Sequence, residues 1–346
     1  MPVMPRDPGS ASMTTMSSRE VRAAAEACGF PLVGLAPAAA LDEGPLRSWL
    51  AAGHDAGMAW MRRNVEDRLD PRRVLPGART VIALGIPYRR PAEERSRLAS
   101  YARGRDYHYA HRERMKKLRK RLLALDAAVE TYACVDTGLA MEKVWGERAG
   151  LGWIGKNGLL INPTLGSWLT LSVMFMDRAV DAYDRPHEDR CGDCSRCLGA
   201  CPTGAFAAPG VVDSRRCVAY HSIENRDTVP EDIRRGFAGR MFGCDVCQDV
   251  CPYNGPHIPE GDRRFAPRPV AALTPLQASA LGEAEFQAAA AGSAVARVGY
   301  DGFRRNALYT IGMARTPSAR PLVERLCQDP SPLVADAARW ALARLR

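Results

Sequence analysis

The sequence predicts an α/β domain in the first half of the chain, then a loop-rich segment dense in cysteine, and last an α-helical unit. Three observations predict this order. Apolar, β-branched runs alternate with stretches of helical periodicity up to about residue 180. Eight cysteines crowd between residues 191 and 251, and short amphipathic segments follow residue 304. We therefore expect domains at 17–180, 181–260 and 261–346, preceded by a tail.

The N-terminal elements begin after that tail. Residues 1–16 carry Pro, Ser and Met without an apolar core, so we expect a flexible tail there. Ser17 and Glu20 form a capping-box pair that opens a short Ala-rich helix ending at Gly29. A second helix is expected from Leu46, and the folded part of the chain is predicted to begin near Ser17.

Three apolar runs predict the strands of the first domain, at residues 79–86, 127–135 and 168–176. Between the first two, residues 107–125 show helical periodicity and a strongly basic face. Strands that alternate with helices predict an α/β domain. The basic positions of that helix are His111, Arg112, Arg114, Lys116, Lys117, Arg119, Lys120 and Arg121.

A tightly spaced cysteine run opens the middle segment. It spells C-x2-C-x2-C-x3-C-P, the bacterial spacing of thiolates that hold an iron-sulfur cluster. A lone cysteine and a C-x2-C-x3-C-P half complete eight thiolates, enough for two 4Fe-4S clusters. In two-cluster ferredoxins the cysteine before the proline reaches the other cluster, so we assign the ligands crosswise. One set is then Cys191, Cys194, Cys197 and Cys251, and the other is Cys201, Cys217, Cys244 and Cys247.

Two other uses of these cysteines are less consistent with the spacing. A zinc site requires closed four-thiolate sets from spaced CxxC pairs, which explains neither the tight first run nor the two Cys-Pro endings. Disulfides are disfavoured because no export signal is visible at the N-terminus. The three remaining cysteines, Cys28, Cys134 and Cys327, lie in apolar or helical contexts and are expected to be core thiols.

The last third of the chain begins with a linker at residues 254–269, where six Pro and Gly residues preclude a long element. Helical segments follow at 304–313, 319–328 and 333–345. The last two resemble one HEAT-type unit. Because a single unit cannot bury its own apolar face, we expect it to dock on the rest of the protein.

The composition of the chain indicates which kinds of partner it can bind. The 346 residues carry a net charge of +9, which favours an anionic partner such as nucleic acid. Lysine occurs at only five positions, so the excess arginine is also consistent with genome composition. The longest apolar stretches fall far short of the roughly 20 residues that span a bilayer. We expect a cytoplasmic protein without a membrane partner.

An unusual stretch precedes the cysteines. Residues 135–138 read VDTG, and residues 147–158 read ERAGLGWIGKNG, with four glycines in nine residues that let backbone approach a bulky ligand. This run matches neither a P-loop nor a dinucleotide fingerprint. Asp136 follows a strand and is expected to be partly buried, which would raise the pKa of its carboxyl and suit a general acid. A turn or cap aspartate is the alternative.

These motifs together resemble the epoxyqueuosine reductase family. The resemblance rests on VDTG, ERAGLGWIGKN, RGRDYH at residues 103–108, both cysteine sets and the HEAT-like end, and it covers nearly the whole chain from Ser17. It implies a cobalamin-dependent, two-cluster oxidoreductase, similar in its N-terminal domain to reductive dehalogenases. Such an enzyme reduces epoxyqueuosine to queuosine at the wobble position of tRNA with a GUN anticodon (the Tyr, His, Asn and Asp type). An external electron donor is implied, and we expect a monomer.

The resemblance also implies roles for single residues. Asp136 matches the family's proton donor, which would protonate the oxygen that leaves the epoxide. Cobalamin is implied to be base-off, with no protein histidine on cobalt. His108 fits this, because the Asp106 to His111 stretch lacks the closing glycine of D-x-H-x-x-G, so we expect His108 to be a packing or pocket-lining residue. The implied corrin contacts are Arg63, Asp136, Lys156, Asn157, Ser222 and Glu224.

Two other functions remain open. A reductive dehalogenase-like enzyme would use the same cofactors on a small organohalide, but the basic C-terminal unit and the lack of an export signal count against it. A non-enzymatic, ferredoxin-like electron carrier would dock through the HEAT-like unit. Binding of cobalamin separates the carrier from both enzymes.

Overall fold

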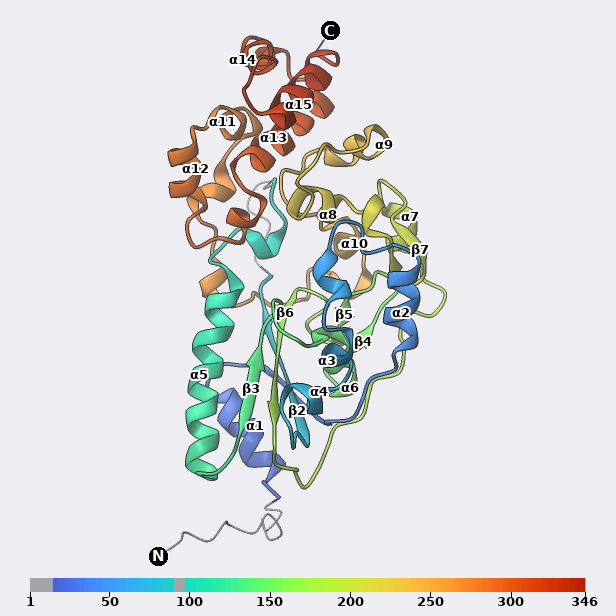
Figure 1. Cartoon of the computed structure of the whole chain (residues 1–346), viewed down its shortest axis with the longest axis vertical. Coiled ribbons are helices and arrows are strands. Elements are labelled where there is room, and N and C mark those ends of the chain that lie inside the picture. The colour runs from blue at the N-terminus through green and yellow to red at the C-terminus, as the bar shows by residue number, and fades with distance from the viewer. Residues whose placement is uncertain (1–14, 90–96, 346) are drawn as a thin grey trace, which may run out of the picture.

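The computed structural model describes residues 15–89 and 97–345, and its central element is a four-stranded sheet (Figure 1). The strand order is β1 (Leu32–Pro37), β2 (Thr80–Pro87), β6 (Leu169–Met176), β3 (Thr131–Cys134). The strands at 80–87 and 169–176 agree with the prediction, β3 is shorter than the predicted run, and β1 was not expected. Every neighbouring pair is antiparallel, so the domain is α/β only in that helices and strands alternate along the chain.

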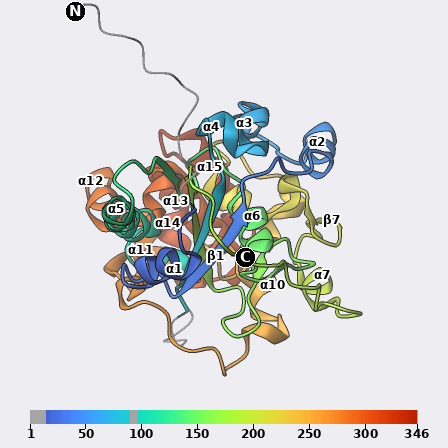
Figure 2. The same ribbon diagram turned by 90° about the horizontal axis from the view of Figure 1, so that it is seen from below.

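Both faces of the sheet are covered, which explains the continuous apolar runs of β2 and β6. Alternate residues of a strand point to opposite faces. Ile82 therefore enters a core shared with α1 (Ser18–Glu26) and α5 (Tyr107–Leu125), whereas Val81 enters a second core. Figure 2 shows α1 and α5 on one side of the strands and α2, α3 and α6 on the other. The second side carries α2 (Gly44–Ala51), α3 (Val65–Leu69), α4 (Pro71–Val74) and α6 (Glu142–Arg148).

The folded part of the chain begins slightly before Ser17, where it was predicted to begin. Ser17 caps α1, and its hydroxyl oxygen accepts a hydrogen bond from the backbone N–H of Glu20 at 3.4 Å, as the capping pair predicts. Met16 was expected to belong to the tail, but it is buried, pairs with Val180 in a parallel bridge and donates its N–H to the carbonyl of Ala179. The rest of the expected tail, residues 1–14, lies outside the described residues.

Helix α5 begins and ends at the predicted residues, but its basic side chains do not share one face. His111 is buried, and its ring nitrogens lie 2.7 Å from the Ser172 hydroxyl and 2.9 Å from the Thr170 hydroxyl. Arg114 is also buried and pairs with Asp262. The exposed basic face is therefore smaller than expected and consists of Arg112, Lys116, Lys117, Arg119, Lys120 and Arg121.

The cysteine segment is built from short elements, as expected where ligation rather than apolar burial organises the backbone. Its pieces lie against the hairpin of β4 (Trp153–Ile154) and β5 (Leu160–Ile161) on one side and the C-terminal helices on the other (Figure 1). In order they are α7 (Arg196–Ala200), β7 (Phe206–Ala208), β8 (Val211–Val212), α8 (Val218–Ile223), α9 (Glu231–Arg234) and α10 (Val246–Asp249), joined by 3₁₀ turns.

The C-terminal region is helical, as predicted, and its helices are α11 (Pro275–Ala280), α12 (Glu283–Ala290), α13 (Tyr300–Ala314), α14 (Arg320–Leu326) and α15 (Pro332–Leu342). Helices α14 and α15 pack on each other, and α15 packs on α13. Apolar side chains of α13, α14 and α15 share one core with Val218 and Phe237 of the cysteine segment. In the two described ranges, no helix is both long enough and apolar enough to cross a membrane.

Helix α13 also holds the cysteine segment through buried polar side chains. The guanidinium of Arg305 donates to the backbone carbonyls of His221, Asn225 and Asp227. Asn306 donates to two further carbonyls, and the Thr310 hydroxyl donates to that of Arg240 at 2.7 Å. Through these bonds and the shared apolar core, the helical region docks on residues 218–241 of the cysteine segment, and a second core joins it to Leu98 and Ala102 of the first domain.

Candidate active site and cluster-binding loops

Two groups of thiols form in the cysteine segment. Burial raises the pKa of Cys251, and the nearby thiols of Cys191, Cys197 and Cys194 raise it further. Burial also raises the pKa of Cys197, which lies close to Cys191 and Cys194. The structure therefore brings the first predicted set together, including Cys251 from 50 residues beyond the first run.

The second predicted set is also brought together. Burial raises the pKa of Cys217, with a contribution from the thiol of Cys201. Burial raises the pKa of Cys244 to about 11, and Cys217 adds to it. Cys247 is coupled in the same way to Cys244 and Cys217. All eight thiols are free in this structure, so each is available as a ligand.

The spacing within each set suits a cluster better than one ion. Among the residues described, no three His, Cys, Asp or Glu side chains lie close enough to hold a single metal ion. A cluster of four irons separates its thiolates further, because its own iron and sulfide atoms fill the space between them. Two sulfurs already accept hydrogen bonds, Cys191 from the indole N–H of Trp153 at 3.4 Å and Cys201 from the N–H of Ala205 at 3.2 Å. Such bonds favour the thiolate form.

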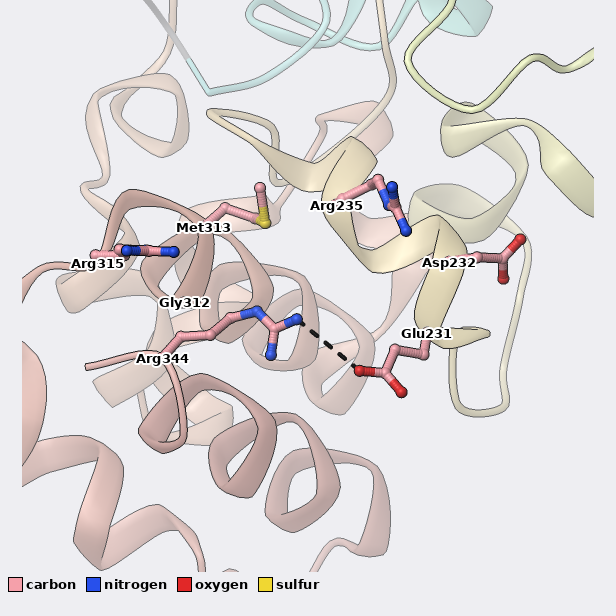
Figure 3. A pocket seen from close by; sticks show the side chains of 7 residues that line it. All are labelled: Glu231, Asp232, Arg235, Gly312, Met313, Arg315 and Arg344. Atoms are coloured by element: carbon pink, nitrogen blue, oxygen red, sulfur yellow. Dashed lines mark ion pairs between the residues drawn. The ribbon is translucent and has the colours of Figure 1, made fainter. Parts of the chain in front are cut away.

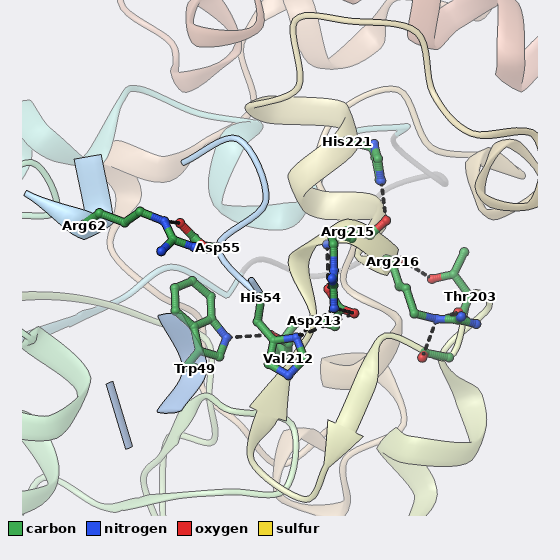
Figure 4. Close-up of polar contacts among 11 residues, drawn as sticks. Trp49, His54, Asp55, Arg62, Thr203, Val212, Asp213, Arg215, Arg216 and His221 are labelled. Carbon is green, nitrogen blue, oxygen red and sulfur yellow. Dashed lines mark hydrogen bonds and ion pairs between the residues drawn. The ribbon is translucent and has the colours of Figure 1, made fainter. Parts of the chain in front are cut away.

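The loop that carries the second set is braced from both sides (Figure 4). The Arg216 guanidinium donates to the carbonyls of Thr203 and Gly204, and the Thr203 hydroxyl donates back to the carbonyl of Arg216 at 2.5 Å. From the first domain, the Trp49 indole N–H donates to the carbonyl of Val212 at 2.7 Å. The backbone between Cys201 and Cys217 is therefore fixed independently of any bound cluster.

Asp136 lies at the end of β3, in a left-handed backbone conformation with φ of 55°. Its backbone N–H donates to the Glu142 carboxylate at 2.7 Å. Its own carboxylate is 51% exposed, lies 3.5 Å from Nε2 of His108 and accepts a hydrogen bond from Tyr107. A non-glycine residue in this conformation is strained, and such strain gathers at functional sites.

The environment of Asp136 differs from the expected one. We predicted burial and a raised pKa. Burial does oppose ionisation, but the positive charge of His108, 3.5 Å away, with contributions from Tyr107 and Arg297, outweighs it and lowers the pKa. Asp136 is therefore ionised at neutral pH in the free protein, and a proton must reach it from a neighbour before it can act as an acid.

His108 is that neighbour. Burial disfavours its imidazolium, but the carboxylates of Asp106, 2.8 Å from Nδ1, and Asp136 outweigh burial and raise the pKa to about 9. His108 is therefore protonated at neutral pH. His108 was expected to be a packing or pocket-lining residue, because nothing in the sequence shows that residues 108 and 136 meet.

A second carboxyl lies in the same site. Burial, and then the charge of Asp136, raise the pKa of Glu142 to about 7. The ammonium of the next residue, Lys143, donates to the carbonyl of Gly158 at 2.7 Å. The Lys143 residue as a whole is exposed, but the protein around its ammonium desolvates the charge and lowers its pKa. Lys143 is also coupled electrostatically to Cys247. The acid–base residues and the second thiol set are therefore neighbours.

Aromatic rings support this arrangement. Tyr107 stacks on His108 with ring centroids 4.4 Å apart, Tyr101 meets Tyr107 edge-on at 6.0 Å, and Tyr88 meets Tyr101 at 6.4 Å. The Tyr88 hydroxyl reaches Gln248, beside the second thiol set, at 3.3 Å. This line of rings fixes the position of His108 relative to the cysteine loop.

The implied corrin contacts are placed unevenly. Ser222 is buried, bonds to the N–H of Gly243 and cannot touch a ligand from there, so it is a structural residue. Lys156 donates to the carbonyl of Gly192 in the first cysteine run. Arg63 is exposed. Asn157 is buried and leaves its Nδ2 without a hydrogen-bond partner.

Glu224 lies closer to the acid–base residues. It pairs with Arg297, whose guanidinium lies over Trp60 at 5.6 Å and acts on Asp136. At Gly152 and Gly155 a Cβ would lie 2.1 Å from the carbonyl oxygen and 2.4 Å from the side chain of Ile161. These two glycines therefore allow the β4–β5 hairpin to pack closely on Ile161.

A separate cavity of about 610 Å³ opens between α9 and the ends of α13 and α15 (Figure 3). None of the predicted site residues lines it. The charged side chains that line the cavity are of both signs, three arginines and two acidic residues, and Arg344 lies 3.9 Å from Glu231. The residues are Glu231, Asp232, Arg235, Gly312, Met313, Arg315 and Arg344.

Comparison with known proteins gives consistent matches. A family model described as "4Fe-4S double cluster binding domain" matches residues 190–254, and one described as "Epoxyqueuosine reductase QueG, DUF1730" matches residues 68–137. The epoxyqueuosine reductase of Gloeobacter violaceus is 42% identical over 311 residues, which cover 86% of this chain and 96% of that protein.

Two solved structures extend the match to three dimensions. An epoxyqueuosine reductase in complex with an epoxyqueuosine-modified tRNA-Tyr stem loop superposes with a TM-score of 0.88 at 28% identity, covering 94% of this chain and 89% of the other. The Bacillus subtilis enzyme, with an aspartate-bearing catalytic loop swung out of its active site, gives 0.86 at 28% identity, covering 94% and 90%.

Proposed function

The chain belongs to the epoxyqueuosine reductase family, and from this membership we infer that it reduces epoxyqueuosine to queuosine in tRNA. The observation that carries the chemistry is the proton-holding pair of His108 and Asp136, placed beside a thiol set for an iron-sulfur cluster. Conversion of the epoxide to an alkene consumes two electrons and two protons and releases one water. The site must therefore hold protons as well as accept electrons.

The two thiol sets are proposed as the crosswise ligands of two 4Fe-4S clusters, and base-off cobalamin as the group beside Asp136. When bound, these groups supply the electrons and the cobalt chemistry that the epoxide requires. The residues present fit cobalamin. Asn157 offers a buried Nδ2 that has no hydrogen-bond partner. Lys143 and Asp136 are exposed, and the surrounding protein shifts the pKa of each. We propose Arg63, Asn157 and Glu224 as further contacts. Lys156 is a weaker candidate.

No protein histidine is proposed for cobalt. Both ring nitrogens of His108 face carboxylates. His111 is held by two hydroxyls, and His221 is held by the carbonyl of Arg215 and the amide of Asn225. Each of these rings is therefore already occupied by protein groups.

The protons are assigned to the chain's own residues. In the free protein His108 carries the proton and Asp136 the negative charge, so the pair shares one proton at its 3.5 Å contact. We propose that this proton passes through Asp136 to the departing epoxide oxygen, with Asp136 as the immediate donor. Glu142, with a pKa of about 7, is positioned to hold the second proton.

Exposed cations are proposed to hold the tRNA by its phosphates. Six lie along α5, and Arg235, Arg315 and Arg344 line the cavity between α9 and the last helices, where α14 and α15 form the proposed HEAT-like unit. Substrates are proposed to be tRNAs with GUN anticodons, an external protein is proposed to donate electrons, and the enzyme is proposed to act as a monomer. Binding should weaken steeply with salt, because phosphate contacts release counterions.

The test is an anaerobic assay of the reconstituted protein with cobalamin, a strong reductant and tRNA from cells that lack the enzyme. Mass spectrometry of the wobble nucleoside should show loss of one oxygen, dependent on cobalamin. Asp136→Asn should keep both clusters and cobalamin but lose turnover by about a hundred-fold to ten-thousand-fold. Asp301→Asn, on α13 and 44% exposed, is the matched control. Near-normal turnover of Asp136→Asn would remove the donor assignment.

A further inference from the structure

A bulky side chain is exposed one residue along the chain from His108. Tyr109 is 46% exposed, and among the described residues only Leu125 and Leu276 are comparably exposed large hydrophobic side chains. A single exposed apolar residue is ordinary on a protein surface. Tyr109 differs from the other two in its place and in its neighbours.

The position of Tyr109 on α5 is fixed by contacts of the residues around His108. Tyr109 directly follows His108 in the first turn of α5, where Asp106 caps the helix by accepting the N–H of His108 at 2.9 Å. Tyr107 stacks on the ring of His108. The backbone that carries Tyr109 is therefore held by the same contacts that position the proton-holding pair.

Its neighbours are cationic. The guanidinium of Arg105 lies 5.2 Å from the ring centroid of Tyr109. Arg105 is in turn held by Glu113 at 3.2 Å, and Glu113 also lies 3.6 Å from Arg264. Arg112 is close enough to Asp106 to lower its pKa, after burial and His108 have acted on it. An exposed ring among arginines is the combination that single-stranded nucleic acid binds, through stacking and phosphate contacts.

We propose that Tyr109, supported by Arg105, is a stacking platform for a nucleobase next to the modified nucleotide in the anticodon loop. The proposal rests on the proposed function. For the modified base to reach Asp136 it must leave the stack of the loop, so its neighbour loses a stacking partner. The Tyr109 ring, one residue from His108, replaces that partner and holds the loop open. Tyr109 is thus a substrate-positioning residue, and the proton chemistry does not require it.

The test measures binding of an anticodon stem loop by three variants. Tyr109→Ala should weaken binding about 5-fold to 100-fold and raise KM similarly, with kcat changed less than about twofold, because one stacked base is lost. Tyr109→Phe should bind as the wild type does. Leu125→Ala, which removes a 45% exposed side chain from the other end of α5, should change nothing.

A second RNA makes the result specific to stacking. With an abasic linker in place of the neighbouring nucleotide, wild type and Tyr109→Ala should bind equally weakly. Wild-type affinity of Tyr109→Ala, or an equal loss with both RNAs, would overturn the proposal. Conversion is scored separately. If the wild-type protein binds the stem loop but does not reduce it, the proposed function is wrong. The binding of the Tyr109 variants would still decide whether Tyr109 stacks on a base.

Discussion

Replacing His108 by Gln should change the shape of the pH profile as well as the rate. In the proposed mechanism, the imidazolium is the proton source, and its pKa of about 9 lies well above the ordinary 6.5. Because the folded site favours the protonated form, His108 keeps its proton at neutral pH and loses it as the pH rises through about 9. Wild-type kcat should therefore fall in two steps as the pH rises, first near pH 7, where Glu142 loses its proton, and then near pH 9, where His108 loses its own.

The magnitudes follow from the pKa. A rise from 6.5 to about 9 corresponds to about 3 kcal/mol in favour of the imidazolium. About 99% of His108 is then protonated at pH 7, and only about a tenth at pH 10, so loss of the His108 proton alone should halve kcat near pH 9 and lower it about tenfold by pH 10. The side chain of His108 is only 17% exposed, so solvent screening reduces these figures little.

The His108→Gln variant should behave differently. Without the cation, the pKa of Asp136 should rise towards its ordinary 3.8, yet Asp136 remains ionised at pH 7 with no proton source. The rate at pH 7 should fall by about a hundred-fold or more, and it should rise nearly tenfold for each unit that the pH is lowered from 7 towards 5.5.

The assay is single-turnover conversion by pre-reduced enzyme, so that the pH dependence of the reductant does not enter. Iron and cobalamin content are measured for each variant. The double variant His108→Gln, Asp136→Asn should be no slower than the worse single variant, because residues that act as one unit are not additive. Parallel pH profiles of wild type and His108→Gln, or fully additive losses, would refute the shared-proton reasoning.

Three further predictions concern the rest of the molecule. Cys217→Ala should lower bound iron from about eight to about four atoms per chain, whereas Cys327→Ala should leave it unchanged, as elemental analysis would show. Arg305→Met should lower the melting temperature by roughly 5–10 °C, since three carbonyls lose a charged donor, whereas the exposed Arg320→Gln should not; equal melting would contradict this. Burial lowers the pKa of His111 to about 3, so the unfolded chain binds a proton first as the pH falls. His111 alone should then lower the free energy of unfolding by about 1 kcal/mol between pH 6.5 and 5.5, so the difference between wild type and His111→Gln in parallel denaturant titrations should change by that amount.

The sequence predicted those features that depend on short spacing or on full burial. Both strands that cross the middle of the sheet were found because their two faces are covered, which leaves a continuous apolar run. Strand β1 was missed because its six residues include Gly34 and Pro37, which are poor strand signals. The proposed thiol sets agree with the neighbours of Cys251, Cys217 and Cys244 in the structure, and the spacing of the first run suggested them without any knowledge of the fold.

The active site was predicted only in part, because its chemistry depends on contacts between distant residues. Asp136 was singled out, but the expected shift of its pKa was in the wrong direction, since the cation that lowers it lies 28 residues earlier in the chain. Glu142 and Arg297 were not found at all, as neither belongs to a recognisable motif. Ser222 was expected at the cofactor, but it serves the backbone of a neighbouring loop.

The bonds from α13 to the cysteine segment bear on how the protein is made. Carbonyl groups between residues 221 and 241 have buried donors on Arg305, Asn306 and Thr310, 65 to 84 residues later in the chain. During synthesis all eight cysteines are made before these donors exist. These carbonyls therefore stay open to water until α13 is made, and a chain that ended before residue 300 would leave them without their buried donors.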